Sequence, residues 1–273
     1  MEIDELKKLC NEIRIDILDS IVEAGSGHIG GSFSMVEIFV ALYYEVMNID
    51  PKNPKMKGRD RFVLSKGHSC PCLYAVLANK GFFPKEELMR ERKYHSILQG
   101  HPDSKRCPGV EASSGSLGQG FSIAAGMALG AKVTGEKCQV YTVIGDGECG
   151  EGMVWEAAAA SAHYKLDNLT VILDHNGLQI DGPNEKVMDP RDLRAKFEEF
   201  GFETIDVKDG NDITQVLAAL REPRVEGKPR FLDCHTIKGK GVSFMENRLE
   251  WHAKLPTQDE YRSAVAELKG AVK

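Results

Sequence analysis

The second half of the chain alternates short apolar runs of strand character with helical segments, and this alternation constrains the fold more than any other feature. Strands are predicted over 139–144, 169–173, 202–207 and 230–236, and helices over 152–164, 191–199 and 211–221. A helix that connects two such strands returns the chain to the same edge of a sheet, so each repeat forms a βαβ unit. The pattern therefore predicts an α/β fold, in which a parallel sheet is flanked by helices on both faces.

The first half of the chain is expected to add helices around one short strand. Apolar residues at steps of three or four predict an amphipathic helix over 2–23. It is expected to end at Ala24-Gly25-Ser26-Gly27, where a glycine can adopt the left-handed conformation of a helix terminus. Ser34 is expected to cap a second helix over 35–47, with Glu37 at the spacing of a capping box. The other predicted elements are a strand over 62–64, helices over 69–80 and 119–132, and an irregular segment over 81–120.

Composition and charge narrow the class of protein. The 273 residues suit one large domain, which we expect over 1–255, followed by a short helical tail over 256–273. A net charge of −6 disfavours nucleic acid or an anionic membrane as a general partner. The chain has neither a long apolar run nor a basic, apolar N-terminus, so we expect neither a membrane span nor secretion. Seven cysteines without C-x-x-C spacing indicate reduced thiols and a cytoplasmic location, and no second pair completes a zinc site with Cys70 and Cys72.

Polar residues follow two successive predicted strands at the point where each strand ends. Gly145-Asp146-Gly147 comes after the strand over 139–144, and its glycines allow either an ordinary turn or a close approach to a ligand. Asn176 follows the next strand, 30 residues after Asp146, so both are expected at the same edge of the sheet. A carboxylate and a carboxamide oxygen, with a nearby backbone carbonyl, are hard ligands for Mg²⁺ or Ca²⁺. We therefore predict a metal site that holds a diphosphate.

Half of the eight histidines lie in loops next to glycine or proline: His28, His68, His101 and His252. Imidazole titrates near neutral pH, so a cluster of them at one sheet edge could pass protons to and from a carbonyl or an alkoxide. His95 and His163 lack such a context. His175 is expected to point away from Asn176 because side chains alternate along a strand, and the role of His235 is open.

Seven short segments, in order along the chain, resemble the transketolase family between about residue 20 and residue 260. They are Ser26-Gly27-His28, Leu64–His68, Gly100-His101-Pro102, Gly115–Gly120, Gly145–Glu156, Asp174–Gly182 and Trp251–Pro256. Within them, Gly-Asp-Gly followed about 30 residues later by asparagine matches the signature of thiamine diphosphate enzymes. The resemblance implies the thiamine diphosphate-binding fold, with thiamine diphosphate and Mg²⁺ as cofactors and Ca²⁺ as an alternative ion.

The resemblance also implies a role for each matching residue. The metal ligands would be Asp146, Asn176 and the carbonyl of Leu178. The cofactor contacts would be His68, Gly115, Ser116, Leu117, Gly147, Asn176 and Ile180, together with Glu151 and Glu156, which match acids near the cofactor and the contact between two copies. The catalytic residues, in the channel for the sugar hydroxyls and the reacting carbonyl, would be His28, His101 and His252.

The implied reaction is transfer of a two-carbon ketol unit from a ketose phosphate to an aldose phosphate. In the transketolase family a glutamate on a separate pyrimidine-binding domain starts this chemistry, and nothing after residue 256 replaces it here. The chain is therefore half of an enzyme split over two polypeptides, a truncated chain or an inactive homologue. Its two ends favour the split enzyme, so we expect a partner subunit with the pyrimidine domain and two copies of each half.

Departures from the family pattern leave the substrate open. Ser116 stands where the family usually has a proline, and Gly30-Gly31 stand where it usually has Gly-Ala-Pro. The segment 238–241 either attracts phosphate or is a solvated loop. One alternative is half of a deoxyxylulose-phosphate synthase-like enzyme or of a specialised sugar transketolase. Others are the α half of a 2-oxo acid dehydrogenase and a non-catalytic cofactor-binding homologue. A nicotinamide dehydrogenase is disfavoured because no G-x-G-x-x-G follows an early strand.

Overall fold

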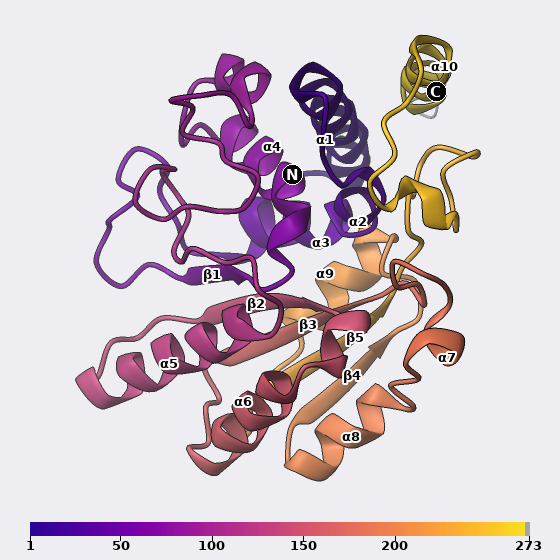
Figure 1. Ribbon diagram of the computed structural model, residues 1–273. Helices are drawn as coiled ribbons and strands as arrows, with labels where there is room; N and C mark the ends of the chain where they lie inside the picture. The colour runs from indigo at the N-terminus through magenta and orange to yellow at the C-terminus, as the bar shows by residue number, and fades with distance from the viewer. Residues whose placement is uncertain (271–273) are drawn as a thin grey trace.

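Five parallel strands form one sheet in the order β1-β2-β3-β5-β4 (Figure 1). The computed structural model describes residues 1–270 of the chain. The strands are β1 (Arg61–Leu64), β2 (Val140–Gly145), β3 (Leu169–His175), β4 (Glu203–Val207) and β5 (Arg230–His235). Every hydrogen-bonded pair of strands is parallel. The predicted α/β class is confirmed, and the observed strand ends lie within two residues of the predicted ones.

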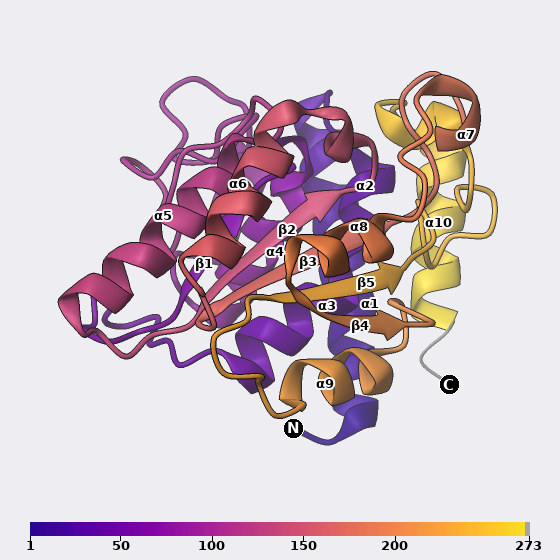
Figure 2. The same ribbon diagram turned by 90° about the horizontal axis from the view of Figure 1, so that it is seen from below.

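The sheet separates two layers of helices (Figures 1 and 2). One face carries α5 (Gln119–Thr134), α6 (Gly152–His163) and α8 (Leu193–Phe200). The other face carries α1 (Ile3–Ala24), α3 (Val36–Ala41), α4 (Cys70–Lys80) and α9 (Ile213–Arg221). The chain steps from β1 through β2 to β3 in one direction, so right-handed crossovers place α5 and α6 on the same face. It reverses direction between β4 and β5, and α9 accordingly lies on the opposite face.

An apolar cluster on each face packs the helices against the sheet. One cluster joins α1, α3, α4 and α9 to sheet residues such as Leu64 and Ile172. The other surrounds Phe197 of α8 and Phe231 of β5, whose rings stack with centroids 4.0 Å apart. Strand β2 is buried along its whole length, and β3 is buried up to its last residue. These two strands therefore leave the core only at their carboxyl ends, where the polar residues that follow them meet.

Shorter elements lie in the connections between these helices and strands. They are α2 (Ile29–Phe33), α7 (Asn184–Val187) and the 3-10 turns η2 (Gly67–Ser69), η3 (Lys85–Arg90), η4 (Gly147–Gly150) and η5 (Leu249–His252). The segment 81–120 is irregular, as predicted, apart from η3 and the start of α5.

The predicted helical tail contains α10 (Gln258–Gly270). This helix buries Ala264 and Leu268, and the Tyr261 hydroxyl donates a hydrogen bond to Asp19 of α1 over 2.7 Å. The last three residues of the predicted tail lie outside the described residues. The division of the chain at residue 256 stays a prediction.

The predicted end of α1 is confirmed, whereas the predicted start of the next helix is wrong. Helix α1 ends at Ala24, and Gly25 has a φ of 69°, as expected of a left-handed cap. The cap predicted at Ser34 is wrong, because Met35 holds the cap position of α3 and the Ser34 hydroxyl lies 2.8 Å from a carboxylate oxygen of Asp174. The predicted helix is also shorter than expected, since α3 ends at Ala41 and a π-helical turn, η1 (Leu42–Val46), follows it.

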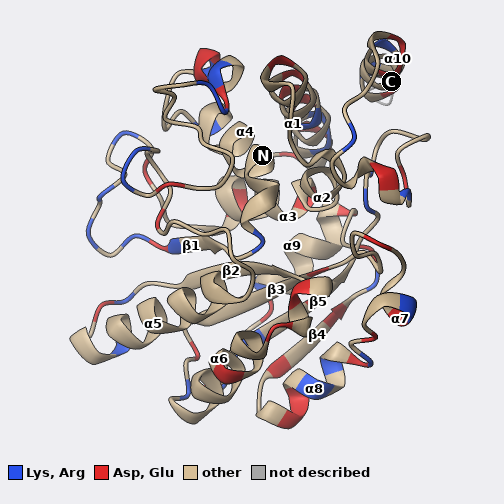
Figure 3. Ribbon diagram, in the orientation of Figure 1, with Lys and Arg blue, Asp and Glu red and all other residues tan. Residues whose placement is uncertain are grey.

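The surface helices carry both charge signs. Figure 3 shows acidic and basic residues side by side on α8 and α10. All seven cysteines are free and buried. No helix within residues 1–270 is long and apolar enough to cross a membrane.

A buried ion pair joins α1 to α3 behind the sheet. The side chains of Arg14 and Glu37 are 3% and 8% exposed, and two N–O contacts of 2.8 and 2.7 Å link them. Arg14 also donates to the Phe33 carbonyl, and the Asn211 amide donates to Glu37. This pairing explains why Glu37 takes no part in a capping box. Removal of either partner would leave the other charge unpaired in the core.

We expect Arg14→Met and Glu37→Leu each to lower the free energy of unfolding by about 3–5 kcal/mol, because each strands a buried charge. The double variant should lose less than the sum of the two single losses. Urea denaturation followed by circular dichroism measures all three. Glu260→Gln, which removes an exposed pair with Lys254, is the control and should change stability little. Additive losses in the double variant would contradict the prediction.

Candidate functional site

The carboxyl ends of β2 and β3 border a cavity of about 360 Å³. Most of the residues predicted from the sequence line it: His28, His68, Gly115, Leu117, Asp146, Gly147, Asn176, Leu178, Ile180 and His252. The parallel register brings them together, because Gly145 at the end of β2 pairs with Asp174 near the end of β3. The Gly-Asp-Gly turn and the asparagine after the next strand thus share one edge of the sheet, as predicted.

The other predicted residues do not line this cavity. His101 is exposed and lies beside the Gly115 loop, where a β-carbon on Gly115 would come within 3.3 Å of the imidazole. Ser116, Glu151 and Glu156 are exposed, the last two at the start and in the first half of α6. The structure therefore joins His101 to the site through the Gly115 loop and leaves the other three on the surface.

Asp146 presents a nearly buried carboxylate to the cavity, with 2% of the residue exposed. The backbone N–H groups of Gly147 and Gly177 donate to its two oxygens over 2.8 and 2.5 Å. Burial raises the pKa of this carboxyl, and the negative charge of Asp174 raises it further. A cation bound in the cavity would oppose both effects, so this carboxylate is suited to a positively charged ligand.

The segment that follows β3 places two further oxygen donors beside Asp146. The side-chain amide nitrogen of Asn176 donates to Asp174 over 3.2 Å, which orients the amide. Its oxygen accepts a hydrogen bond from the backbone N–H of Leu178 over 3.2 Å. Because Gly177 between them donates to Asp146, the three predicted metal-ligating residues belong to one connected unit. The set offers only oxygen atoms, which suits a hard divalent cation.

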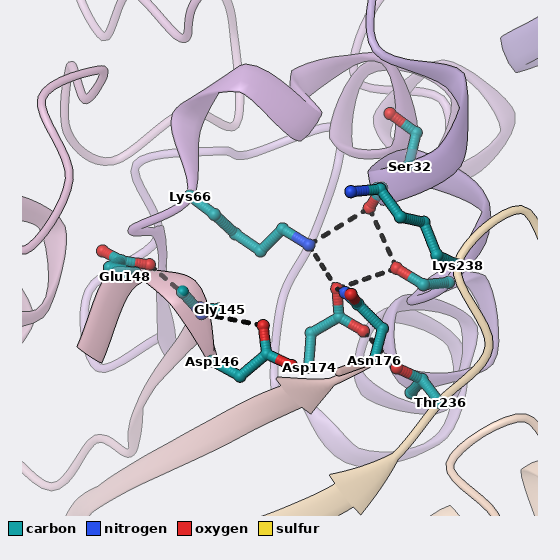
Figure 4. Close-up of polar contacts among 12 residues, drawn as sticks. Ser32, Lys66, Gly145, Asp146, Glu148, Asp174, Asn176, Thr236 and Lys238 are labelled. Carbon is teal, nitrogen blue, oxygen red and sulfur yellow. Dashed lines mark hydrogen bonds and ion pairs between the residues drawn. The ribbon is translucent and has the colours of Figure 1, made fainter. Parts of the chain in front are cut away.

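A buried ion pair between Lys66 and Asp174, which the sequence pattern does not predict, supports this unit (Figure 4). The Thr236 hydroxyl also donates to Asp174, and Ser34 contacts its other oxygen. Burial alone would raise the pKa of Asp174, but the Lys66 ammonium and these hydrogen bonds outweigh it and lower the pKa. Asp174 is therefore ionised, and it holds Asn176 in place.

Glu148, which also lines the cavity, is a second residue that the sequence pattern does not identify. It is 2% exposed and accepts hydrogen bonds from the backbone N–H groups of Gly118 and Gly145 over 2.7 and 2.9 Å. The Ser65 hydroxyl also donates to it. These contacts tie the Gly115–Leu117 loop to the end of β2. The sequence signal was its place beside Gly147, inside a segment already assigned to the site.

Two loops meet closely at Gly67. A β-carbon there would lie 2.9 Å from the backbone nitrogen of Gly115 and 2.9 Å from the Ser114 carbonyl carbon, closer than real contacts allow. Only glycine therefore lets the loop after β1 approach the Gly115 loop. This approach holds both loops at the cavity, where backbone N–H groups can serve a bound anion.

Three histidines from distant segments form a cluster at the cavity. The ring centroids of His28, His68 and His252 lie 5.2 to 5.4 Å apart. Burial, followed by nearby positive charges, lowers the pKa of His28 and of His252 to about 4 and that of His68 to about 2. The imidazoles are therefore neutral near pH 7. This sharpens the prediction of proton transfer, because a neutral imidazole donates from one nitrogen and accepts at the other.

Lys238 supplies a positive charge beside these rings. It is 3% exposed, and its ammonium lies 3.2 Å from Nδ1 of His252. Burial lowers its pKa to about 8, and the charge of Lys66 contributes in the same direction. Of the two interpretations of the segment 238–241, the solvated loop is wrong at Lys238, since this lysine lines the cavity. Its buried ammonium is available to a phosphate or to a carbonyl oxygen.

Comparisons with known proteins identify the family of the chain. The family described as "Transketolase, thiamine diphosphate binding domain" matches residues 5–269. The chain is 42% identical to the 6-deoxy-6-sulfo-D-fructose transketolase subunit of a Clostridium species, over 97% of this chain and 96% of that one. It is 43% identical to a subunit of the apulose-4-phosphate transketolase of Actinobacillus succinogenes, over 97% and 96%. The transketolase structure from Campylobacter jejuni superposes with a TM-score of 0.93 at 30% identity, over 98% of this chain and 43% of that one.

We expect the free energy of unfolding to fall as the pH drops below about 6.5, the ordinary histidine pKa. The unfolded chain binds protons at His28, His68 and His252 in this range, whereas the folded chain resists them down to about pH 4, so acid favours unfolding. His68→Gln should lose stability less steeply than the wild type between pH 6.5 and 4. Urea denaturation across this range measures the slope. His163→Gln, at the end of α6, is the control, and equal slopes for His68→Gln and wild type would contradict the assignment.

Proposed function

The chain belongs to the transketolase family, and from this premise we propose that it is the diphosphate-binding subunit of a two-chain transketolase. Such an enzyme transfers a two-carbon ketol unit from a ketose phosphate to an aldose phosphate, with thiamine diphosphate and Mg²⁺. The observation that carries the proposal is the oxygen-donor unit of Asp146, Asn176 and Leu178, which faces the same cavity as three neutral histidines.

The residues present fit a diphosphate bound through a divalent metal. Asp146 is a buried carboxylate without a basic side chain bonded to it among the described residues, so a metal would supply the missing positive charge. Asn176 would add its amide oxygen and Leu178 its carbonyl oxygen. These oxygens favour Mg²⁺, and Ca²⁺ is the alternative, since both ions prefer such ligands. The metal would in turn hold the diphosphate oxygens.

The remaining cofactor contacts are proposed on the same basis. Gly147, Gly115 and Leu117 line the cavity, where glycine lets the backbone come close to a bound phosphate. Ile180 is 65% exposed although it lines the cavity, which suits an apolar contact with the cofactor ring. Glu151 and Glu156 lie on the exposed side of α6, and we assign them to the contact with a second copy of the chain.

When bound, thiamine diphosphate supplies a carbanion equivalent that accepts the two-carbon unit. The chain's own part is to position the sugar and to manage protons. His28, His68 and His252 would donate hydrogen bonds to its hydroxyls and carbonyl as neutral imidazoles, and His101, beside the Gly115 loop, would contribute with them. Lys238, held against His252, would stabilise negative charge that develops on the carbonyl oxygen.

A partner subunit is part of the proposal. The relatives that match over nearly their whole length are named as subunits, whereas the chain covers only 43% of the Campylobacter jejuni transketolase. We therefore propose that a separate chain carries the pyrimidine-binding domain, with two copies of each chain in the assembly. The free, buried cysteines support a reducing, cytoplasmic location.

The identity of the sugar leaves room for a second candidate function. The relatives from Clostridium and Actinobacillus succinogenes are named for different substrates, a sulfo-sugar and a phospho-sugar, although this chain is almost equally similar to both. A specialised sugar transketolase is therefore the second candidate. The two are separated by assaying the assembled pair with xylulose 5-phosphate, 6-deoxy-6-sulfo-D-fructose and pyruvate as donors. Activity with pyruvate alone would favour a deoxyxylulose-phosphate synthase-like enzyme instead.

We predict that this chain alone, with thiamine diphosphate and Mg²⁺, shows no ketol transfer and that adding the partner subunit restores it. The reason is that the family supplies the pyrimidine-side acid from a separate domain, which the partner would carry. A coupled assay of the aldose or ketose product measures turnover. Substantial turnover by the chain alone would refute the two-chain arrangement.

We expect Asp146→Ala to weaken Mg²⁺-dependent binding of thiamine diphosphate by the assembled pair at least about tenfold, since one charge-bearing ligand of the metal is lost. Isothermal titration calorimetry measures the affinity with and without Mg²⁺. Asp189→Ala, an aspartate outside the cavity lining, is the matched control and should bind as the wild type does. Equal affinities for the Asp146→Ala variant and the wild type would show that Asp146 is not a ligand of the metal.

A further inference from the structure

The carboxyl ends of β3, β4 and β5 carry a second group of polar side chains that the transketolase site does not use. In register, His175 pairs with His235, and Asp233 pairs with Leu173 on one side and with Asp206 on the other. Residues in register on parallel strands project to the same face of a sheet, as do residues two apart on one strand. His175, Asp206, Asp233 and His235 therefore project to one face.

This face is the one opposite to the ion pair of Asp174. Leu173, two residues before His175 on β3, packs in the apolar cluster of α5, α6 and α8. Asp174 instead contacts Ser34, which lies between α2 and α3 on the other face. Alternation along β3 thus sends Asp174 and His175 in opposite directions. The second group is consequently separate from the cavity that Asp146 and Asn176 line.

The ligand atoms of this group lie at distances that suit one metal ion. Nδ1 of His175 is 2.8 Å from Oδ1 of Asp233, and Nε2 of His235 is 4.0 Å from Oδ2 of Asp233. One ligand atom from each of the three residues falls within 4.8 Å of the others. Ligands about 2.0–2.2 Å from a tetrahedral ion lie roughly 3.5 Å from one another, so small rotations of the side chains suffice.

The chemistry of the donors selects the class of metal. Two imidazoles and a carboxylate favour Zn²⁺ and related transition-metal ions over Mg²⁺, which prefers oxygen ligands alone. The His235 and His175 side chains are 44% and 27% exposed, so an ion can reach them, whereas Asp233 is 7% exposed and fixed. Oδ1 of Asp206 lies 3.1 Å from Nε2 of His235, and it can serve as a fourth ligand while Oδ2 keeps the ion pair with Lys208.

We propose that His175, Asp233 and His235 form a second cation site, which binds Zn²⁺ or a related transition-metal ion. The site crosslinks the carboxyl ends of β3 and β5 on the α8 side of the sheet. The site requires neither the sugar nor the partner subunit, so it can be tested independently of the proposed transketolase activity.

Zinc binding by the full 273-residue chain tests the site, with excess Mg²⁺ present to saturate the oxygen-donor site. Competition with a chromophoric chelator measures the affinity for Zn²⁺, and the visible spectrum of bound Co²⁺ reports nitrogen ligands in a tetrahedral field. We expect one tightly bound ion per chain. His235→Gln and His175→Gln should each weaken binding at least about tenfold, in line with the loss of a ligand.

Two control variants show whether the ion binds at these residues or elsewhere on the chain. Asp146→Asn, at the oxygen-donor site, and His163→Gln, at the end of α6, should each keep one tight Zn²⁺. Zinc should also raise the melting temperature of the wild type and of both controls, but not that of His235→Gln. This variant should still fold, because His235 is exposed at the end of β5. Absence of saturable Zn²⁺ binding, or wild-type affinity in the His175 and His235 variants, would overturn the proposal.

Discussion

The buried carboxylate of Asp174 is the contact on which the rest of the site depends. It receives Lys66 from the loop after β1, Thr236 from the loop after β5 and Ser34 from the junction of α2 and α3. It also orients Asn176, which follows it by two residues. A buried charge is tolerated only when it is fully paired, so all of these segments must be in place together. The ion pair therefore couples correct folding of the sheet edge to the geometry of the proposed metal ligands.

Lys66 and a second buried lysine, Lys238, set the protonation of the histidines in the cavity. Lys66 and Lys238 bring positive charge into a region where burial already disfavours protonated imidazole, and both effects keep the three clustered histidines neutral. Elsewhere in the cavity, burial and the charge of Asp174 raise the pKa of Asp146, so a bound cation would stabilise its ionised form. The cavity thus has a wall suited to a metal and a wall suited to anionic or polar oxygen atoms. A cofactor held through a metal at its diphosphate end, with a separate sugar substrate beside the histidines, would match this polarity.

The sequence predicted the sheet and most of the cavity because their signals are local. Strand and helix periods depend on burial, and the Gly-Asp-Gly turn and Asn176 follow strands whose parallel register places them together. Lys66, Asp174 and Glu148 were missed because their roles depend on partners that are distant in sequence, 108 residues apart for Lys66 and Asp174. The cap predicted at Ser34 was wrong for the same reason, since tertiary pairing with Asp174 outweighs a local motif.

Alternation along β3 explains how one strand end carries two different sets of ligands. The apolar run before Asp174 is buried on both faces of the sheet, so its burial alone tolerates a shift of one residue in register. The charged residues do not tolerate this shift, because it would exchange the directions of Asp174 and His175. Lys66 would then lose its ion-pair partner. The ion pair therefore fixes the register of the strand end. Once Asp174 faces α2 and α3, His175 must face α8, where His235 and Asp233 already project from β5. The position of the second cation site, formed by His175, Asp233 and His235, thus follows from the geometry of the oxygen-donor site. The two sites lie on opposite faces of β3.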